Sequence, residues 1–141
     1  MENRYEVFTT LINSINRSIR RIKNEAMKDY NLKSHHVSCL YYLYKEKSLT
    51  PTELTDLCDE DKAAISRSLD YLEKNGYLIK PKNKNHYNGK ITLTEKGKKI
   101  GEYITKKIDS ILLAVDELIL EENRTIFYES LSLIENSLKN H

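Results

Sequence analysis

The chain has 141 residues, of which 39% are hydrophobic and 31% charged, and its formal net charge is +2. This composition is typical of a soluble protein with one domain, or one compact lobe plus an extension. It differs from the composition of disordered chains. No apolar run approaches the roughly 18–20 residues that span a bilayer, and the N-terminus lacks an apolar signal core. We therefore expect a cytoplasmic protein without a membrane partner.

Residues that support catalysis or metal binding do not form a recognisable set. His35 and His36 are adjacent, and neighbours on a helix point about 100° apart, which is a poor arrangement for holding one ion. Two cysteines, Cys39 and Cys58, make neither a disulfide framework nor a metal cluster. No Ser-His-Asp set, glycine-rich phosphate loop or paired-carboxylate cleft is evident. We expect no enzyme activity, no metal and no cofactor.

The N-terminal third of the chain predicts two helices. An apolar stripe with spacings of four and three predicts a helix from about Arg4 to Tyr30; it comprises Phe8, Ile12, Ile15, Ile19 and Ile22. A second helix is expected to begin at Ser34, because serine is a good N-cap residue. The segment that follows, residues 35–47, is rich in aromatic and aliphatic residues.

A short helix, a turn and a longer helix follow. Thr50 and Pro51 begin the short helix, and Glu53 completes a capping box with Thr50. Leu54 and Leu57 are expected to anchor it. The polar stretch 58–61 predicts a turn in which Asp59, Glu60 or Asp61 caps the next helix, at about 61–75. In that helix Ile65, Leu69 and Leu72 face inward, and an opposite face is exposed: Lys62, Ala63, Ser66, Arg67, Asp70 and Lys74.

Two short strands around a lysine-rich loop predict a β-hairpin wing at about 77–94. Asn75-Gly76 ends the preceding helix, residues 77–79 and 91–93 are the strands, and Asn88-Gly89 is a turn signal. Residues 74–99 contain eight lysines and one acid, whereas residues 108–141 contain seven acids and two bases. This asymmetry predicts a positive field around the hairpin.

The C-terminal third predicts two more helices, with Thr94 capping the first and a break near residues 121–123. Their apolar stripes, like that of the first helix, have no sheet to cover. The simplest remedy is a homodimer in which the termini of two chains pair in a helical bundle; a monomer that folds its own ends together is the alternative. The predicted fold is mainly α with a small β-hairpin wing: a helical dimerisation region at 1–33 and 98–141, and a winged helix-turn-helix DNA-binding lobe at 34–97.

The order of elements, and residues 61–97 in particular, resemble the MarR family of transcriptional regulators. The specific matches are Ile65-Ser66-Arg67, the run from Leu72 to Tyr77, and the run from Leu93 to Gly97. The resemblance implies a homodimer that represses transcription at a pseudo-palindromic operator in double-stranded DNA. It also implies release by a small aromatic or lipophilic effector, or by oxidation.

One departure from the family concerns the wing. Members usually have Asp-x-Arg there, and the corresponding positions are Asn85 and Tyr87. Lysine does not bring a planar fork into a narrow minor groove. We therefore expect the wing to contribute affinity more than sequence discrimination.

The candidate DNA-binding residues are small or hydrogen-bonding residues of the longer helix, helix N-termini, and cations of the wing. Ala63 and Ala64 permit close approach, and Arg67 can fork onto guanine or a phosphate. The full set is Ser34, Thr50, Thr52, Lys62, Ala63, Ala64, Ser66, Arg67, Lys82, Lys84, His86 and Lys90. A solvated helix face is the alternative interpretation, as is a winged helix that contacts proteins.

The resemblance implies an effector site where the first, second and fifth helices meet the lobe. The corresponding residues are Ile15, Ile19, His36, Cys39, Leu40, Leu43 and Ile104; packing in the core is the alternative. A redox-sensing member of the family is a further alternative. It is disfavoured because the acids around Cys58 are expected to raise the pKa of its thiol, and because Cys39 is expected to be buried.

Overall fold

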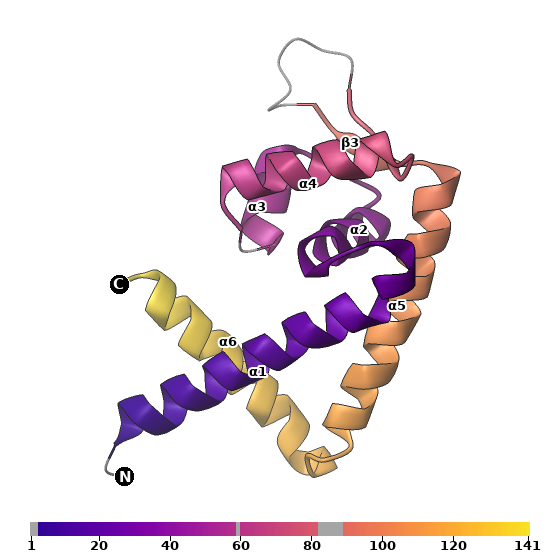
Figure 1. The fold of residues 1–141 in the computed structure, drawn as a ribbon. Coiled ribbons are helices and arrows are strands. Elements are labelled where there is room, and N and C mark those ends of the chain that lie inside the picture. Colours follow the sequence, from indigo (N-terminus) through magenta and orange to yellow (C-terminus); the bar gives the residue numbers. More distant parts are fainter. Residues whose placement is uncertain (1–2, 59, 82–88) are drawn as a thin grey trace. The chain divides into compact units, whose positions relative to one another are not determined.

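The computed structural model describes residues 3–58, 60–81 and 89–141. The chain divides into two compact units, Met1–Thr105 and Lys106–His141, which are described separately. Within the described residues there are six α-helices and one three-stranded antiparallel sheet (Figure 1). The predicted fold class, mainly α with a small wing, is confirmed. No helix in the described part of the chain is long and apolar enough to cross a membrane.

The elements occur in the order expected for a winged helix-turn-helix, with two additions, a 3₁₀ turn after the first helix and a short strand before the third. Two helices and a 3₁₀ turn come first: α1 Arg4–Ala26, η1 Lys28–Tyr30 and α2 Ser34–Glu46. The helix-turn-helix and the sheet follow: β1 Ser48–Leu49, α3 Pro51–Cys58, α4 Lys62–Lys74, β2 Leu78–Ile79 and β3 Ile91–Leu93. The last elements are α5 Glu95–Asp116 and α6 Glu121–Lys139.

The junction between α1 and α2 differs from the prediction in two respects. The first helix ends at Ala26, and a 3₁₀ turn continues the chain to Tyr30. Ser34 is the first helical residue of α2 and not its N-cap, because the extended backbone lies one residue earlier, at Lys33. The Lys33 N–H donates to Nδ1 of His36 at 3.0 Å, so His36, at the third position of the helix, bonds back to the backbone of the N-cap residue, as the third residue of a capping box does.

The caps of α3 and α4 match the sequence patterns. Thr50 and Glu53 form the predicted reciprocal capping box, with N···O distances of 3.2 and 3.1 Å. Of the three candidate acids, Asp61 caps α4 by accepting from the Ala64 N–H at 2.7 Å. Leu54 is buried in α3, but Leu57 is 42% exposed. Leu57 was therefore wrongly assigned as an anchor.

Helix α4 ends in a Schellman motif. Gly76 has φ +79°, the Gly76 N–H donates to the Glu73 carbonyl at 3.0 Å, and the Tyr77 N–H donates to the Leu72 carbonyl at 2.9 Å. This reversal directs the chain into β2, which pairs with β3 through Leu78↔Leu93 and Ile79↔Thr92. The wing therefore starts at a fixed angle to α4.

The sheet contains a third strand that the sequence analysis missed. Ser48 and Leu49 form β1, which pairs with β3, so the strand order is β1-β3-β2. Two residues are too few for a periodic pattern, and their extended conformation depends on pairing with a strand more than 40 residues later. This pairing attaches the start of α3 to the wing.

The core lies within the first unit, around α2. Helix α2 contacts α1, α3, α4 and β3, and in Figure 1 it lies between α1 and the α3–α4 pair. Its residues Cys39, Leu40 and Leu43 have no exposed surface. They pack with buried residues of the helix-turn-helix and the sheet, including Leu54, Ile65, Leu69, Leu72, Ile91 and Leu93. The predicted inner face of α4 is confirmed.

The last elements of the chain have few buried residues. In α5 the buried residues are Gly97, Ile100, Gly101 and Ile104, all in its first half. Helix α6 buries none. The break between α5 and α6 covers residues 117–120 and not the predicted 121–123, because Glu121 and Glu122 form the first turn of α6. Negative side chains in the first turn of a helix interact favourably with the helix dipole.

Candidate nucleic-acid interface

The outer face of α4 is exposed along its whole length. Lys62, Ala63, Ser66 and Arg67 are exposed, as are Asp70 and Lys74 further along, while Ala64 is half-buried. Asp61 anchors the start of this helix and Gly76 its end. A helix fixed at both ends therefore presents an exposed alanine, a hydroxyl, three cations and one carboxylate to the outside.

A groove of about 1050 Å³ lies between the start of α3, the outer face of α4 and the base of the wing. It brings together four of the predicted residues, Thr52, Lys62, Ala63 and Ser66. The remaining lining residues are Pro51, Thr55, Leu69, Asp70, Glu73, Lys80, Pro81 and Ile91. Arg67 is exposed on the same helix but does not line the groove.

Lys80 attaches the wing to α4. Its backbone N–H donates to Oε2 of Glu73 at 3.3 Å, and its ammonium forms an ion pair with the Asp70 carboxylate. At the other side of the hairpin, Gly89 packs so closely on Pro81 that a Cβ at Gly89 would lie 2.1 Å from Pro81 Cγ. The sequence does not reveal these contacts, because they join residues on two sides of a turn that no periodic pattern relates.

Three predicted residues lie at helix starts. Ser34 is half-buried, and its backbone N–H donates to Oδ1 of Asn24 at 2.6 Å. Thr50 holds the cap of α3 with its hydroxyl. Thr52 is exposed beside it and lines the groove. Thr52 is therefore the one of the three whose hydroxyl faces the same groove as α4.

The wing residues are only partly described. Lys90 is exposed directly before β3. Lys82, Lys84 and His86 lie outside the described residues, as do Asn85 and Tyr87, so the predictions for the wing tip are unchanged. Among the described residues, Lys80 is the wing cation nearest to the groove.

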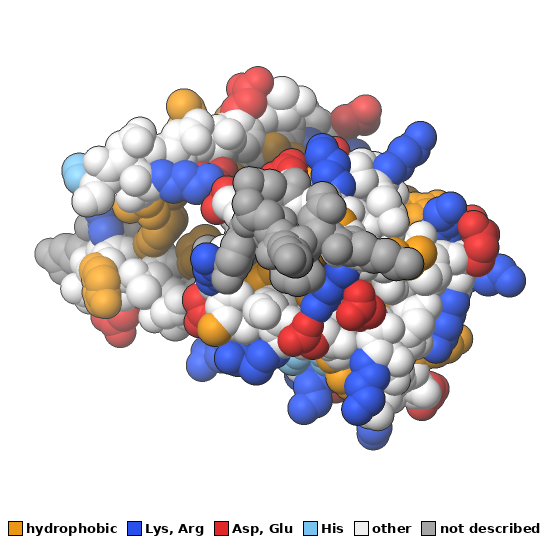
Figure 2. All heavy atoms as spheres, turned by 90° about the horizontal axis from the view of Figure 1, so that it is seen from above, with side chains coloured by type: hydrophobic (Ala, Val, Ile, Leu, Met, Phe, Trp, Pro, Cys, Tyr) orange, Lys and Arg blue, Asp and Glu red, His pale blue; other side chains and the backbone are white. Residues whose placement is uncertain are grey.

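The charge on this face is mixed. In Figure 2 the face turned to the viewer has Lys and Arg side chains with Asp and Glu side chains among them. Two acids of the segment before α4 are used as helix caps, Glu53 for α3 and Asp61 for α4. The Thr50 hydrogen bonds lower the pKa of Glu53. Asp70 is paired with Lys80, so these acids have structural partners next to the exposed cations.

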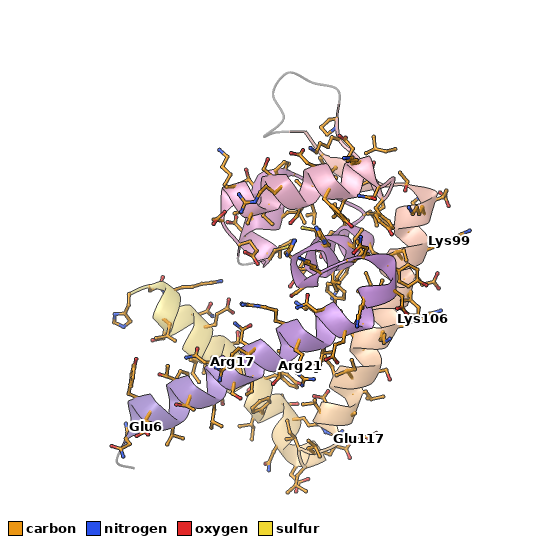
Figure 3. All side chains as sticks on the ribbon, viewed as in Figure 1. Glu6, Arg17, Arg21, Lys99, Lys106 and Glu117 are labelled. Carbon is orange, nitrogen blue, oxygen red and sulfur yellow. The ribbon has the colours of Figure 1, made fainter. Side chains whose placement is uncertain are left out.

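The predicted effector residues fall into two groups. Cys39, Leu40, Leu43 and Ile104 are buried in the core of the first unit, and His36 is nearly buried. Ile15 and Ile19 are exposed on α1. Figure 3 shows Arg17 and Arg21 one turn apart on the same helix; Arg21 pairs with Glu25 at 3.8 Å.

His36 links α2 to α4. Its ring stacks on Tyr71 with a centroid distance of 4.3 Å and an interplanar angle of 18°, and its Nδ1 accepts the Lys33 N–H. The Tyr71 hydroxyl donates to the Asn31 carbonyl at 2.6 Å. Burial, with the nearby charges of His35 and Lys33, lowers the pKa of His36 from 6.5 to about 4. The imidazole is neutral at pH 7, as its role as an acceptor requires.

The two cysteines form a pair. The Cys39 thiol donates a hydrogen bond to the Cys58 sulfur, and this interaction, opposed by burial and assisted by Lys23, lowers the pKa of Cys58. The same contact and burial raise the pKa of Cys39. The expectation that surrounding acids raise the pKa of Cys58 is wrong. It considered only residues near in sequence, whereas Cys39 and Lys23 come from α2 and α1. Burial of Cys39 is confirmed.

Comparisons with known proteins find a family model, curated relatives and solved structures that are similar to this chain. The model of the MarR family matches residues 30–86. A Bacillus cereus protein described as an uncharacterised HTH-type transcriptional regulator is 28% identical over 130 residues, which cover 91% of this chain and 86% of the relative.

Two solved structures share the fold. A putative MarR family transcriptional regulator from Listeria monocytogenes, complexed with 26mer DNA, has a TM-score of 0.84 at 24% identity, covering 94% of this chain and 89% of that chain. Staphylococcus aureus MarR, in complex with salicylate and kanamycin, has a TM-score of 0.83 at 17% identity, covering 99% and 95%. The family match covers α2, which lies in the core, and α3 and α4, which contribute residues to the groove. Residues 30–86 are thus similar to the MarR family, and the chain shares the winged helix-turn-helix fold of these solved structures.

Proposed function

We propose that this protein is a homodimeric repressor that binds a pseudo-palindromic site in double-stranded DNA and is released by a small aromatic or lipophilic effector. The observation that most supports DNA binding is the outer face of α4. It is exposed, fixed at both ends and composed of Lys62, Ala63, Ser66 and Arg67. The Listeria relative, which has the same fold, is complexed with DNA.

The chemistry of α4 suits the major groove. Alanines at 63 and 64 keep the helix slim and can contact thymine methyl groups, while Ser66 hydrogen-bonds to a base edge or a phosphate. Arg67 offers a planar fork to guanine or phosphate. Thr52 and Lys80 line the groove beside this helix, and Lys90 is exposed directly before β3; we infer that these three residues contact phosphates. The wing tip, with Lys82, Lys84 and His86, is proposed to extend this phosphate contact.

The exposed stripe of α1 supports a homodimer. Phe8, Leu11, Ile12, Ile15 and Ile19 are 41–57% exposed, and α1 buries none of its residues. Large apolar side chains on one face of a helix are costly in water at about 25 cal/mol per Å². Pairing with a second chain covers them, and two-fold symmetry then presents two copies of α4 to one duplex.

The effector is proposed to bind next to the junction of α1, α2 and α5, where the resemblance places the sensing residues. His36, Leu40 and Leu43 are packed in the core, so a ligand must displace side chains there or bind against Ile15 and Ile19 of α1. The Staphylococcus aureus relative is complexed with salicylate and kanamycin, which supports an aromatic acid as the first compound to test.

One experiment tests the DNA proposal. The protein is incubated with a random duplex library, bound DNA is sequenced, and affinity for the selected site is measured as a function of salt. We expect a palindromic consensus and a slope of log affinity against log salt near −0.9 for each phosphate contacted. A protein-binding winged helix would give no consensus and no steep slope, and that outcome would refute the proposal.

A further inference from the structure

A carboxylate lies in the groove beside α4. Lys62, Ser66, Asp70 and Glu73 follow one another at spacings of four, four and three, so they share one side of the helix. All four residues line the groove between α3, α4 and the wing. Asp70 therefore lies one turn beyond Ser66, in the groove on the side of α4 that is proposed to face DNA.

The base of the wing holds this carboxylate in place. The Lys80 ammonium, directly after β2, forms an ion pair with Asp70, and the Lys80 backbone N–H donates to Oε2 of Glu73 at 3.3 Å. The Lys80 side chain is 23% exposed, whereas that of Asp70 is 67% exposed. The Asp70 carboxylate is thus oriented by a partly buried cation and keeps most of its surface open for a further partner.

A carboxylate at this position can recognise only some bases. It accepts hydrogen bonds and donates none. In the major groove the donors are the amino groups of cytosine and adenine, N4 and N6, whereas guanine and thymine present acceptor oxygens at the same edge. A carboxylate placed against an acceptor leaves both groups without a hydrogen bond and away from water, which is costly.

We propose that Asp70 determines sequence specificity by accepting a hydrogen bond from the exocyclic amino group of one base in each half-site. Cytosine is the expected base, because adenine has an acceptor, N7, next to its amino group. The Lys80 ammonium, which is proposed to contact a phosphate, reduces the repulsion between the DNA backbone and the carboxylate. This inference rests on the proposed function in DNA binding.

A purely structural role for Asp70 predicts a different outcome. If its carboxylate only attaches the wing to α4, the loss of Asp70 and the loss of Lys80 weaken binding to every duplex by similar factors. The loss of a residue that reads a base instead changes which base is preferred at one position. The identity of the preferred base therefore separates the two roles.

The first test is selection from a random duplex library by the full-length wild type, Asp70→Asn and Asp70→Ala. We expect the wild type to select cytosine at one position of each half-site and Asp70→Ala to select no base there. Asp70→Asn is expected to select adenine, because an amide donates to N7 and accepts from N6. A consensus that is the same in all three proteins would overturn the proposal.

The base that the wild type selects identifies the donor. A preference for adenine that disappears in Asp70→Ala would support the proposal and assign the hydrogen bond to N6 in place of N4. Guanine or thymine at the position that responds to Asp70 would overturn it, because neither base offers an amino group in the major groove.

Titrations with four duplexes that differ only at this position give the magnitude. We expect the wild type to bind the cytosine duplex at least about fivefold more tightly than the guanine and thymine duplexes, in the range of a single mismatch. In Asp70→Ala the four affinities are expected to lie within about twofold of one another, since no other residue is proposed to read this base. Discrimination that persists in Asp70→Ala would contradict the assignment.

Asp56→Asn is the matched control for the loss of one negative charge. Asp56 is exposed on α3 and does not line the groove. Removal of either carboxylate lessens repulsion by phosphates, so Asp56→Asn and Asp70→Asn are both expected to bind random-sequence DNA more tightly. Only Asp70→Asn is expected to lower the ratio of specific to non-specific affinity, by at least about fivefold. Equal ratios in the two variants would exclude a specific role for Asp70.

Lys80→Met tests the ion pair separately. It is expected to weaken binding to all duplexes and to reduce the slope of log affinity against log salt by about 0.9, as the loss of one phosphate contact does. Cytosine is expected to remain the preferred base. If Asp70→Ala shows the same uniform loss with cytosine still preferred, Asp70 is only a structural partner of Lys80 and the proposal fails.

Failure of this inference is distinguishable from failure of the proposed function. A wild type that selects no consensus would refute the proposed function, and the inference with it. A clear wild-type consensus that the Asp70 variants leave unchanged would refute only the role of Asp70.

Discussion

The winged lobe, residues 34–97, and the N-terminal helix α1 differ in how far their apolar residues are buried. Leu40, Leu43, Leu54 and Leu72 of the lobe have no exposed surface. In α1, five apolar residues are 41–57% exposed: Phe8, Leu11, Ile12, Ile15 and Ile19. Both regions have clear helical periodicity, so periodicity alone does not distinguish a helix that packs within its chain from one that lacks a partner there. The difference indicates that the lobe is stabilised by its own core, and it supports the proposed pairing of α1 with a second chain.

The largest expected effect concerns α1. Ile12→Glu combined with Ile15→Glu puts two carboxylates into the proposed dimer contact, where burying an unpaired charge is costly. We expect dimer dissociation at least about 1000-fold stronger, roughly 4 kcal/mol, measured by analytical ultracentrifugation. Thr10→Glu, on the opposite, exposed face of the helix, is the control and is expected to leave the dimer unchanged. A double variant that remains dimeric would show that the stripe is not the interface.

The second effect tests the core of the lobe. Leu43→Ala is expected to lower the free energy of unfolding by about 3 kcal/mol, because it leaves a cavity at a fully buried site. Leu57→Ala, at a leucine that is 42% exposed, is expected to cost less than about 1 kcal/mol. Denaturant unfolding measures both. Equal losses would mean that the lobe does not contain the main core.

The third effect separates DNA recognition from folding. Arg67→Ala is expected to weaken binding to the selected duplex about 10- to 100-fold, roughly 1–3 kcal/mol, with the dimer and its unfolding midpoint unchanged. Lys74→Ala, on the same exposed face near the end of α4, is the control and is expected to cost less. Gel-shift titration compares them. Unchanged affinity in Arg67→Ala would refute its assignment as a reader of DNA.

The smallest effect is on pH dependence. The pKa of His36 is lowered to about 4, so between pH 6.5 and about 4 the unfolded chain binds a proton that the folded chain does not. The stabilisation is present above pH 6.5 and is lost as pH falls toward 4. We expect this loss to be about 2 kcal/mol, less than the full linkage value, because solvent screens part of the interaction.

His36→Gln provides the comparison for this titration, since glutamine can accept the Lys33 N–H but does not titrate. Unfolding free energies of both proteins are measured from pH 7 to pH 4. The wild type is expected to lose more stability than the variant across this range. Parallel curves would contradict a lowered pKa at His36.

The helix-turn-helix was the most predictable part of the molecule, because its signals are local. The Thr50–Glu53 capping box, the inner face of α4 and the stop at Gly76 each depend on residues within four positions of one another. The family resemblance through residues 61–97 agrees with the fold for the same reason. Errors occurred where a local signal had a competitor, as at Ser34, where the N-cap is Lys33 and its N–H donates to His36.

The features that the sequence analysis missed join distant residues. Strand β1 exists because Ser48 and Leu49 pair with β3, and the wing is held by contacts of Lys80 with Asp70 and Glu73. The predicted effector residues illustrate the same limit. Leu40 and Ile15 both belong to apolar stripes of helices, but Leu40 is buried and Ile15 is exposed.

The sequence by itself determined which segments are helices, the cap of α3, the stop of α4 at Gly76 and the polar face of α4, since hydrogen bonds and side-chain periodicity within one helix decide these. Only the tertiary structure decided the surroundings of each side chain. Cys58 is the clearest case: its neighbours in sequence are acids that raise a thiol pKa, but its neighbours in space, Cys39 and Lys23, lower it. Electrostatic interactions depend on distance in space, which the order of residues along the chain does not specify.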